Sequence, residues 1–145
     1  MSDTTVLRVS ERELLPPGYL QDHVFDLSVG DYRGKAEVDG YNPDTFEAIE
    51  ICQSESLVGA PKPGQRRKLA ADVLKLIFLT QLGLITRGRV FVTSQAMYDW
   101  CQQTGSWLNA ARKYYNVSVE LHTHTRKHLR KQIRNVLGRA RREMS

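Results

Sequence analysis

The chain has 145 residues, of which 41% are hydrophobic and 26% are charged, so it fits one globular domain and excludes an intrinsically disordered chain. No apolar run approaches the roughly 18 residues of a membrane-spanning helix. The N-terminus lacks the basic and apolar segments of a secretory signal. Because Cys52 and Cys101 form no CxxC pair, we expect a reduced, cytoplasmic setting.

The net charge of +5 is unevenly distributed along the chain. Residues 126–145 contain eight Lys or Arg residues and one acidic residue, a net +7, which leaves −2 for the first 125 residues. Such an asymmetry indicates a polyanionic partner, most often nucleic acid. The alternative is a solvated helix face. The residues expected to contact phosphates are Arg126, Lys127, Arg130, Lys131, Arg134 and Arg139.

The first half of the chain predicts a short helix followed by an antiparallel meander. Residues 10–15 suit a helix that the following Pro-Pro-Gly would stop. Three segments alternate as strands do, with Gly-, Asn- and Asp-rich turns between them at 30–34 and 40–44. The expected strands are residues 23–29, 35–39 and 46–52.

The second half predicts crossover elements and a final helix. A loop at 54–64 precedes a helix at 65–81, where apolar residues recur at helical spacing and Gly83 is a stop signal. The segments that follow are a strand at 89–93, helices from Gln95 broken near Gly105 with Ser106 capping the second, a strand at 117–121 and a helix from Arg126. The order predicts an α/β protein.

Four aromatic residues of the later helices have two interpretations. Trp100, Trp107, Tyr114 and Tyr115 recur at helical spacing, which is typical of core residues. The alternative is that their rings stack on bases. We expect core positions.

Two carboxylates of the meander, Asp39 and Glu50, are candidate metal ligands. Alternation places Glu50 opposite Ile49 and Ile51, which are expected in the core, so Glu50 should point towards an open face. Neighbouring carboxylates repel each other, and a divalent cation relieves that repulsion. Hard oxygen ligands of this kind suit Mg²⁺ or Mn²⁺.

The helix at 65–81 carries a polar stripe at spacings of three and four residues. Its members are Gln65, Lys68, Asp72 and Lys75. Lys68 or Lys75 could orient a water molecule or stabilise transition-state charge. The alternative is intrahelical ion pairing on a solvated surface.

The pair Asp39 and Glu50, with a strand-to-helix crossover after it, resembles the PD-(D/E)xK restriction-endonuclease-like superfamily over roughly residues 10–125. The resemblance implies one domain at 1–125, with a core of helix, three-stranded antiparallel meander, helix and strand, then further helices and a last strand. Residues 126–145 would add a basic amphipathic helix. It also implies that Asp39 and Glu50 bind Mg²⁺ or Mn²⁺, and that the chain hydrolyses phosphodiester bonds, in DNA rather than RNA.

The chain departs from the family pattern at one position. The family has a lysine two residues after the glutamate, and this chain has Cys52. A helix lysine could replace it, Lys68 as first choice and Lys75 as second, and Gln53 is a further alternative that needs a bulge. The Pro43-Asp44 pair imitates the motif but ranks below Asp39.

Two functions therefore stay open. One is a metal-dependent endonuclease, which at this size would work as a homodimer or as a subunit of a larger complex. The other is a catalytically inactive module that binds nucleic acid or a protein partner within an assembly. A separate zinc site at His122, His124 and His128 is a weaker hypothesis than phosphate binding by these histidines.

Overall fold

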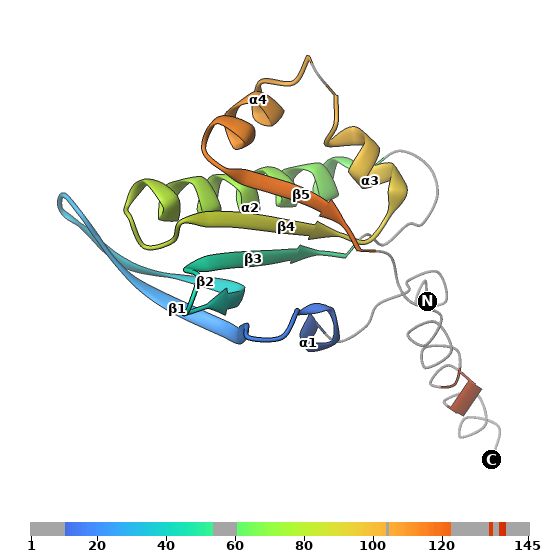
Figure 1. Cartoon of the computed structure of the whole chain (residues 1–145). Helices are drawn as coiled ribbons and strands as arrows, with labels where there is room; N and C mark the ends of the chain where they lie inside the picture. The colour runs from blue at the N-terminus through green and yellow to red at the C-terminus, as the bar shows by residue number, and fades with distance from the viewer. Residues whose placement is uncertain (1–10, 54–60, 104, 123–133, 135–136, 139–145) are drawn as a thin grey trace.

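A computed structural model describes residues 11–53, 61–103, 105–122, 134 and 137–138. The described helices and strands follow one another in the predicted order (Figure 1). They are α1 (Glu11–Leu14), β1 (Leu20–Val29), β2 (Tyr32–Asn42), β3 (Glu47–Cys52), α2 (Pro63–Gln81), β4 (Arg87–Val92), α3 (Gln95–Trp100), α4 (Trp107–Tyr114) and β5 (Val117–Leu121).

The five strands form one mixed sheet in the order β1-β2-β3-β4-β5. The β1–β2 and β2–β3 pairs are antiparallel, whereas β3–β4 and β4–β5 are parallel. Helix α2 supplies the crossover between β3 and β4, and the segment with α3 and α4 supplies the next one (Figure 1). The predicted α/β class is confirmed, with the meander on one side of the sheet and the crossovers on the other.

Side chains pack on both faces of the sheet. The larger core lies against α2, α3 and α4 and contains Leu76 of α2 together with Val90 and Val92 of β4. The smaller core joins Ile49, Ile51 and Phe91 with partly buried residues in and just after α1. Figure 1 shows α1 apart from the other helices, on the opposite side of the sheet. Strand β3 is therefore buried on both faces.

A glycine sets how closely α2 approaches the sheet. A Cβ atom on Gly88 of β4 would lie only 2.7 Å from Cβ of Leu76. Leu76 itself is fully buried. Because no side chain larger than hydrogen fits there without movement, Gly88 allows α2 to lie directly over β3 and β4.

Strand β2 is longer than the sequence pattern predicts. Residues 40–42 belong to the strand, and the turn starts only after Asn42, whose side-chain oxygen accepts a hydrogen bond from the Asp44 amide at 2.9 Å. The predicted turn at 40–44 is therefore wrong in its first half. Asp39 lies inside β2 and not at its end, while Asp44 lies in the turn, as expected.

Two of the four aromatic residues expected in the core are exposed. Trp107 is 81% exposed and Tyr114 is 82% exposed, whereas Trp100 and Tyr115 are half-buried. The core prediction is thus wrong for Trp107 and Tyr114. Both residues lie on the side of α4 that points away from the sheet.

Most of the expected C-terminal helix lies outside the described residues. Within residues 126–145, only Arg134, Leu137 and Gly138 are described, and all three are helical. None of the helices in the described ranges is both long and apolar enough to cross a membrane.

Candidate metal centre

Asp39 is held against β3 by its own side chain. The β2–β3 ladder pairs Gly40 with Ile49, and one step further along, Oδ2 of Asp39 accepts a hydrogen bond from the Ile51 amide at 2.7 Å. The carboxylate takes the place of a backbone carbonyl in the ladder. This contact fixes Asp39 beside the segment of β3 that carries Glu50.

Glu50 is buried, which corrects the expectation that it faces an open side of the sheet. It is 3% exposed and shares its face with Cys52, which belongs to the larger core beneath α2. Ile49 and Ile51 do lie in a core, but it is the smaller one on the opposite face. The prediction that Glu50 faces away from Ile49 and Ile51 is confirmed. The expectation that only one face of β3 is covered is wrong.

The environment of Glu50 makes its ionised form unfavourable. Burial, together with the negative charges of Asp39 and Asp72, raises the pKa of Glu50 to about 8 despite the lowering effect of Lys75. The Lys75 ammonium lies 3.1 Å from Oε1 of Glu50 and also donates to the Glu37 carbonyl at 2.9 Å. This carboxyl therefore has one cationic partner and two anionic neighbours.

Lys68 places a second ammonium group in the same region. It lies 2.8 Å from Oδ2 of Asp72 and 3.5 Å from the Ile51 carbonyl oxygen. Burial lowers the pKa of Lys68, but the hydrogen bond and charge of Asp72 outweigh it, and Cys52 and Asp39 act in the same direction, so the net shift is upwards. The ammonium thus lies near Cys52.

Two further carboxylates, those of Glu11 and Asp22, lie close to the carboxylate of Asp39. Ligand oxygens of Glu11, Asp22 and Asp39 all lie within 4.8 Å of one another. Asp22 has a positive φ of 56° and falls, with Asp39, between the paired residues of the β1–β2 ladder. Burial raises the pKa of Glu11 to about 7, helped by the charge of Asp39 and a hydrogen bond with it, while Lys68 acts in the opposite direction.

The sequence pattern did not single out Glu11 or Asp22. A signal for Asp22 was present, because a two-residue turn at Gly30-Asp31 sets a hairpin register in which Asp22 falls opposite Asp39. Glu11 carries no comparable signal, since its position depends on how α1 packs against the smaller core.

We call this group the acidic centre: Glu11, Asp22, Asp39, Glu50 and Asp72, with Lys68 and Lys75. Carboxylate oxygens suit hard divalent cations. Clustered carboxylates with raised pKa values gain when a cation replaces their protons. The converging oxygens of Glu11, Asp22 and Asp39 could therefore hold a cation such as Mg²⁺ or Mn²⁺, without selecting one of them, whereas Glu50 is not part of that converging group and contacts Lys75.

The remaining predicted site residues are placed as follows. Gln53 follows β3 and is half-buried. The His122 ring stacks on Phe91 with centroids 3.8 Å apart and lies 3.4 Å from Oε1 of Glu120, so it belongs to the opposite face of the sheet. Arg134 is exposed. The residues outside the described part of the chain are His124, His128, Arg126, Lys127, Arg130, Lys131 and Arg139.

Comparison of the chain with protein-family models, with curated proteins and with solved structures finds no significant match.

Proposed function

We propose that the chain is a metal-dependent nuclease that hydrolyses DNA phosphodiester bonds at the acidic centre. One observation carries the proposal. The buried carboxyl of Glu50 lies beside Asp39 and 3.1 Å from the Lys75 ammonium, so acidic ligands and a cation meet at one place between β2, β3 and α2.

The roles follow from charge and position. Asp39 and Glu50 would hold Mg²⁺ or Mn²⁺, and the Glu11–Asp22 pair could complete the ligand set beside Asp39. When bound, such a cation would polarise the phosphodiester and lower the pKa of a bound water molecule. The acidic side chains would hold the ion, and the lysines of α2 would contact the developing negative charge.

Lys68 is the better candidate for orienting the attacking water. It is half exposed, its ammonium lies near Cys52 and Asp39, and it is hydrogen-bonded to the buried Asp72. Lys75 is more buried and is already paired with Glu50, so its main role would be to hold that carboxylate. Lys68 is therefore our first candidate, and Lys75 our second, for the lysine that the restriction-endonuclease-like superfamily has at the position of Cys52.

The test is cleavage of supercoiled plasmid and of labelled DNA oligonucleotides with 5 to about 10 mM Mg²⁺ or Mn²⁺, a range chosen to saturate weak carboxylate sites. Wild type should cleave, and Asp39→Asn and Glu50→Gln should each lose at least about 100-fold in rate. Asp26→Asn is the matched control, because Asp26 is an exposed acid of the same sheet. Cleavage by Glu50→Gln at the wild-type rate would remove the site from the proposal.

A second function has its own supporting observation. Cys52 is 1% exposed and cannot act as a cation, and the carboxyl of Glu50 already has a raised pKa and a contact with Lys75. A catalytically inactive module that binds nucleic acid or a protein partner would have the same centre for structural reasons. Absence of cleavage, with nucleic-acid binding retained, would favour this alternative.

Assembly belongs to the proposal as well. A single acidic centre cuts one strand at a time, so cleavage of both strands of a duplex calls for two copies or a partner subunit. Light scattering of the full chain, with and without DNA, measures which of these holds.

A further inference from the structure

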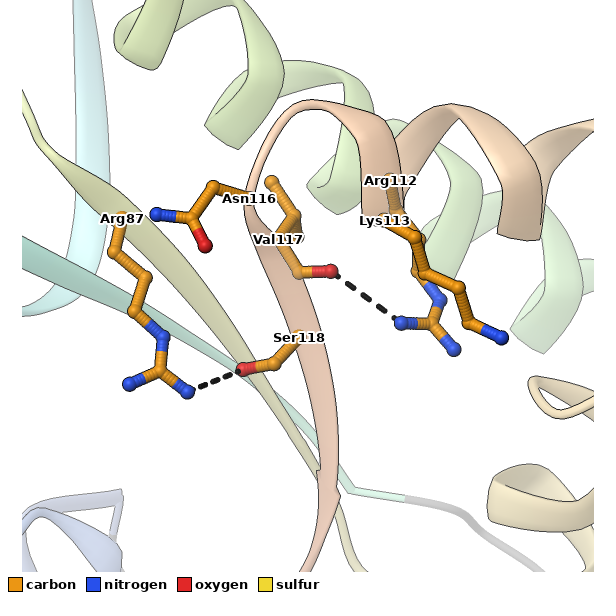
Figure 2. Close-up of a pocket in the computed structure, with 6 residues that line it drawn as sticks. All are labelled: Arg87, Arg112, Lys113, Asn116, Val117 and Ser118. Carbon is orange, nitrogen blue, oxygen red and sulfur yellow. Dashed lines mark hydrogen bonds between the residues drawn. The ribbon is translucent and has the colours of Figure 1, made fainter.

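A basic hollow lies between the end of α4 and the beginnings of β4 and β5 (Figure 2). Its volume is about 370 Å³. Three cationic side chains and no carboxylate line it. The lining residues are Arg87, Arg112, Lys113, Asn116, Val117 and Ser118.

Arg112 gives the hollow a buried positive charge. The residue is 4% exposed, and its guanidinium donates to three neutral acceptors: Oδ1 of Asn109 at 3.2 Å, the Val117 carbonyl at 3.3 Å and the Cys101 carbonyl at 2.9 Å. Burial lowers the pKa of Arg112, but an arginine keeps its charge in proteins. Within the described ranges no carboxylate neutralises it, so the positive potential extends into the hollow.

Arg87 and Lys113 stand at the two sides of the hollow and are accessible. Arg87 donates to Oγ of Ser118 at 3.3 Å, and it approaches carboxylates only at longer range, 3.8 Å to Glu47 and 4.0 Å to Glu120. Lys113 is exposed, and in the described part of the chain no ion pair holds it. The opening in Figure 2 therefore presents donors suited to phosphate oxygens.

Two exposed aromatic rings lie on the helix that borders the hollow. Trp107 and Tyr114 begin and end α4, and seven residues of helix separate their Cα atoms by about 10 Å. Tyr114 directly follows Lys113 and contacts Tyr115 edge to face, with ring centroids 5.0 Å apart. Trp107 is 81% exposed and Tyr114 is 82% exposed, and exposed rings on a helix that also carries Lys113 can stack on unpaired bases.

We propose that the outer face of α4 and the basic hollow bind single-stranded nucleic acid, with phosphates at Arg87 and Lys113 and bases on Trp107 and Tyr114. The inference deepens the proposed nuclease function, on which it rests, by naming the substrate class as nucleic acid with an unpaired segment. Binding at this surface needs no metal, because none of the acidic centre lines the hollow. A duplex binds less well because its bases are already stacked on one another.

The test measures binding of a fluorescein-labelled dT oligonucleotide and of a duplex of equal length by anisotropy, with the full chain and EDTA. We expect the single strand to bind more tightly, with quenching of Trp107 emission. Trp107→Ala and Tyr114→Ala should each weaken binding about 5- to 100-fold. Lys113→Glu should weaken it and lower its salt dependence.

Tyr32→Ala and Lys35→Glu form the matched control, since both residues are exposed on the β1–β2 hairpin far along the sheet from α4. Both should bind as wild type does. Unchanged affinity in Trp107→Ala, Tyr114→Ala and Lys113→Glu, each folded by circular dichroism, would overturn the inference. So would equal affinity for duplex and single strand, or no affinity for either, as expected for a protein-docking surface.

The two proposals fail separately. Single-strand binding that depends on α4, without metal-dependent cleavage, would overturn the nuclease proposal alone. Cleavage that depends on Glu50 but is insensitive to the three α4 substitutions would overturn the binding surface alone. Binding by Glu50→Gln at the wild-type affinity supports a surface separate from the acidic centre.

Discussion

The Lys75 ammonium lies 3.1 Å from Oε1 of Glu50, and this ion pair joins α2 to the buried face of β3. The lysine side chain is 34% exposed and the glutamate side chain only 4%. Desolvation opposes the charge of a buried carboxylate, so Glu50 keeps its proton up to a pKa of about 8, and the Lys75 contact favours the ionised form. A divalent cation that binds Glu50 therefore competes with a proton and with Lys75.

Glu50 should make the protein less stable as the pH rises. Its pKa is raised to about 8 in the folded protein from an ordinary value of 4.5. Between these values the folded chain keeps a proton that the unfolded chain has released, so the free energy of unfolding falls as the pH increases. Glu50→Gln should reduce this fall and be more stable than wild type at pH 8 by at least about 1 kcal/mol.

Urea unfolding at pH 5, 6.5 and 8 measures the difference. Glu11, with its pKa raised to about 7, leaves part of the pH dependence in the variant. Mn²⁺ should raise the melting temperature of wild type more at pH 8 than at pH 6, because the ion must displace these protons. A wild-type stability that is constant from pH 5 to 8 contradicts the buried, charge-coupled Glu50.

The two lysines of α2 should differ in their effects on cleavage. Lys68→Ala should reduce the maximal rate by about 100-fold with little change in the metal concentration for half activity, because it acts on the water. Lys75→Ala should mainly change the metal dependence, since it frees the Glu50 carboxylate. The measurement is single-turnover cleavage across a Mn²⁺ titration. The reverse pattern would exchange the two roles.

The ion pair between Arg89 and Glu120 on the opposite face should stabilise the fold at neutral pH and lose this effect in acid. Arg89 donates to both carboxylate oxygens of Glu120 at 2.7 Å, and this hydrogen bond, opposed by burial, lowers the pKa of Glu120 to about 2. Its contribution is complete above pH 4.5 and is lost as the pH falls towards 2. Glu120→Gln should cost about 1–3 kcal/mol at pH 7 and less at pH 3, measured by urea unfolding.

Gly88 should be intolerant of a side chain. Gly88→Ala forces a Cβ to within 2.7 Å of Leu76 Cβ and should destabilise the protein by about 1–3 kcal/mol. Gly64 is the control, because nothing lies within 4 Å of a Cβ there and the residue is in the first turn of α2. Gly64→Ala should be neutral or stabilising by up to about 1 kcal/mol, as thermal unfolding can show.

Periodicity predicted the order of the elements because each strand and helix here is local and regular. It also placed Asp39 and Glu50 on neighbouring strands, and Lys68 with Lys75 on one side of α2. Periodicity could not show that both faces of β3 are covered, since Glu50 and Cys52 read as an open polar face when α2 is not yet placed. The meeting of Glu11 with Asp39 depends on tertiary packing in the same way.

The sequence pattern also could not predict that two aromatic rings of α4 are exposed. Helical spacing treats Trp107 and Tyr114 as core because large apolar residues are usually buried. Only the position of α4 relative to the sheet reveals that both rings are exposed.

Mn²⁺-dependent nicking of supercoiled plasmid by wild type and Glu50→Gln, at equal concentrations of folded protein, tests the acidic centre most directly. The account predicts nicking by wild type that EDTA abolishes, and a loss of at least about 100-fold in the variant. Equal nicking by both proteins, or none by wild type across the Mn²⁺ range, would contradict it.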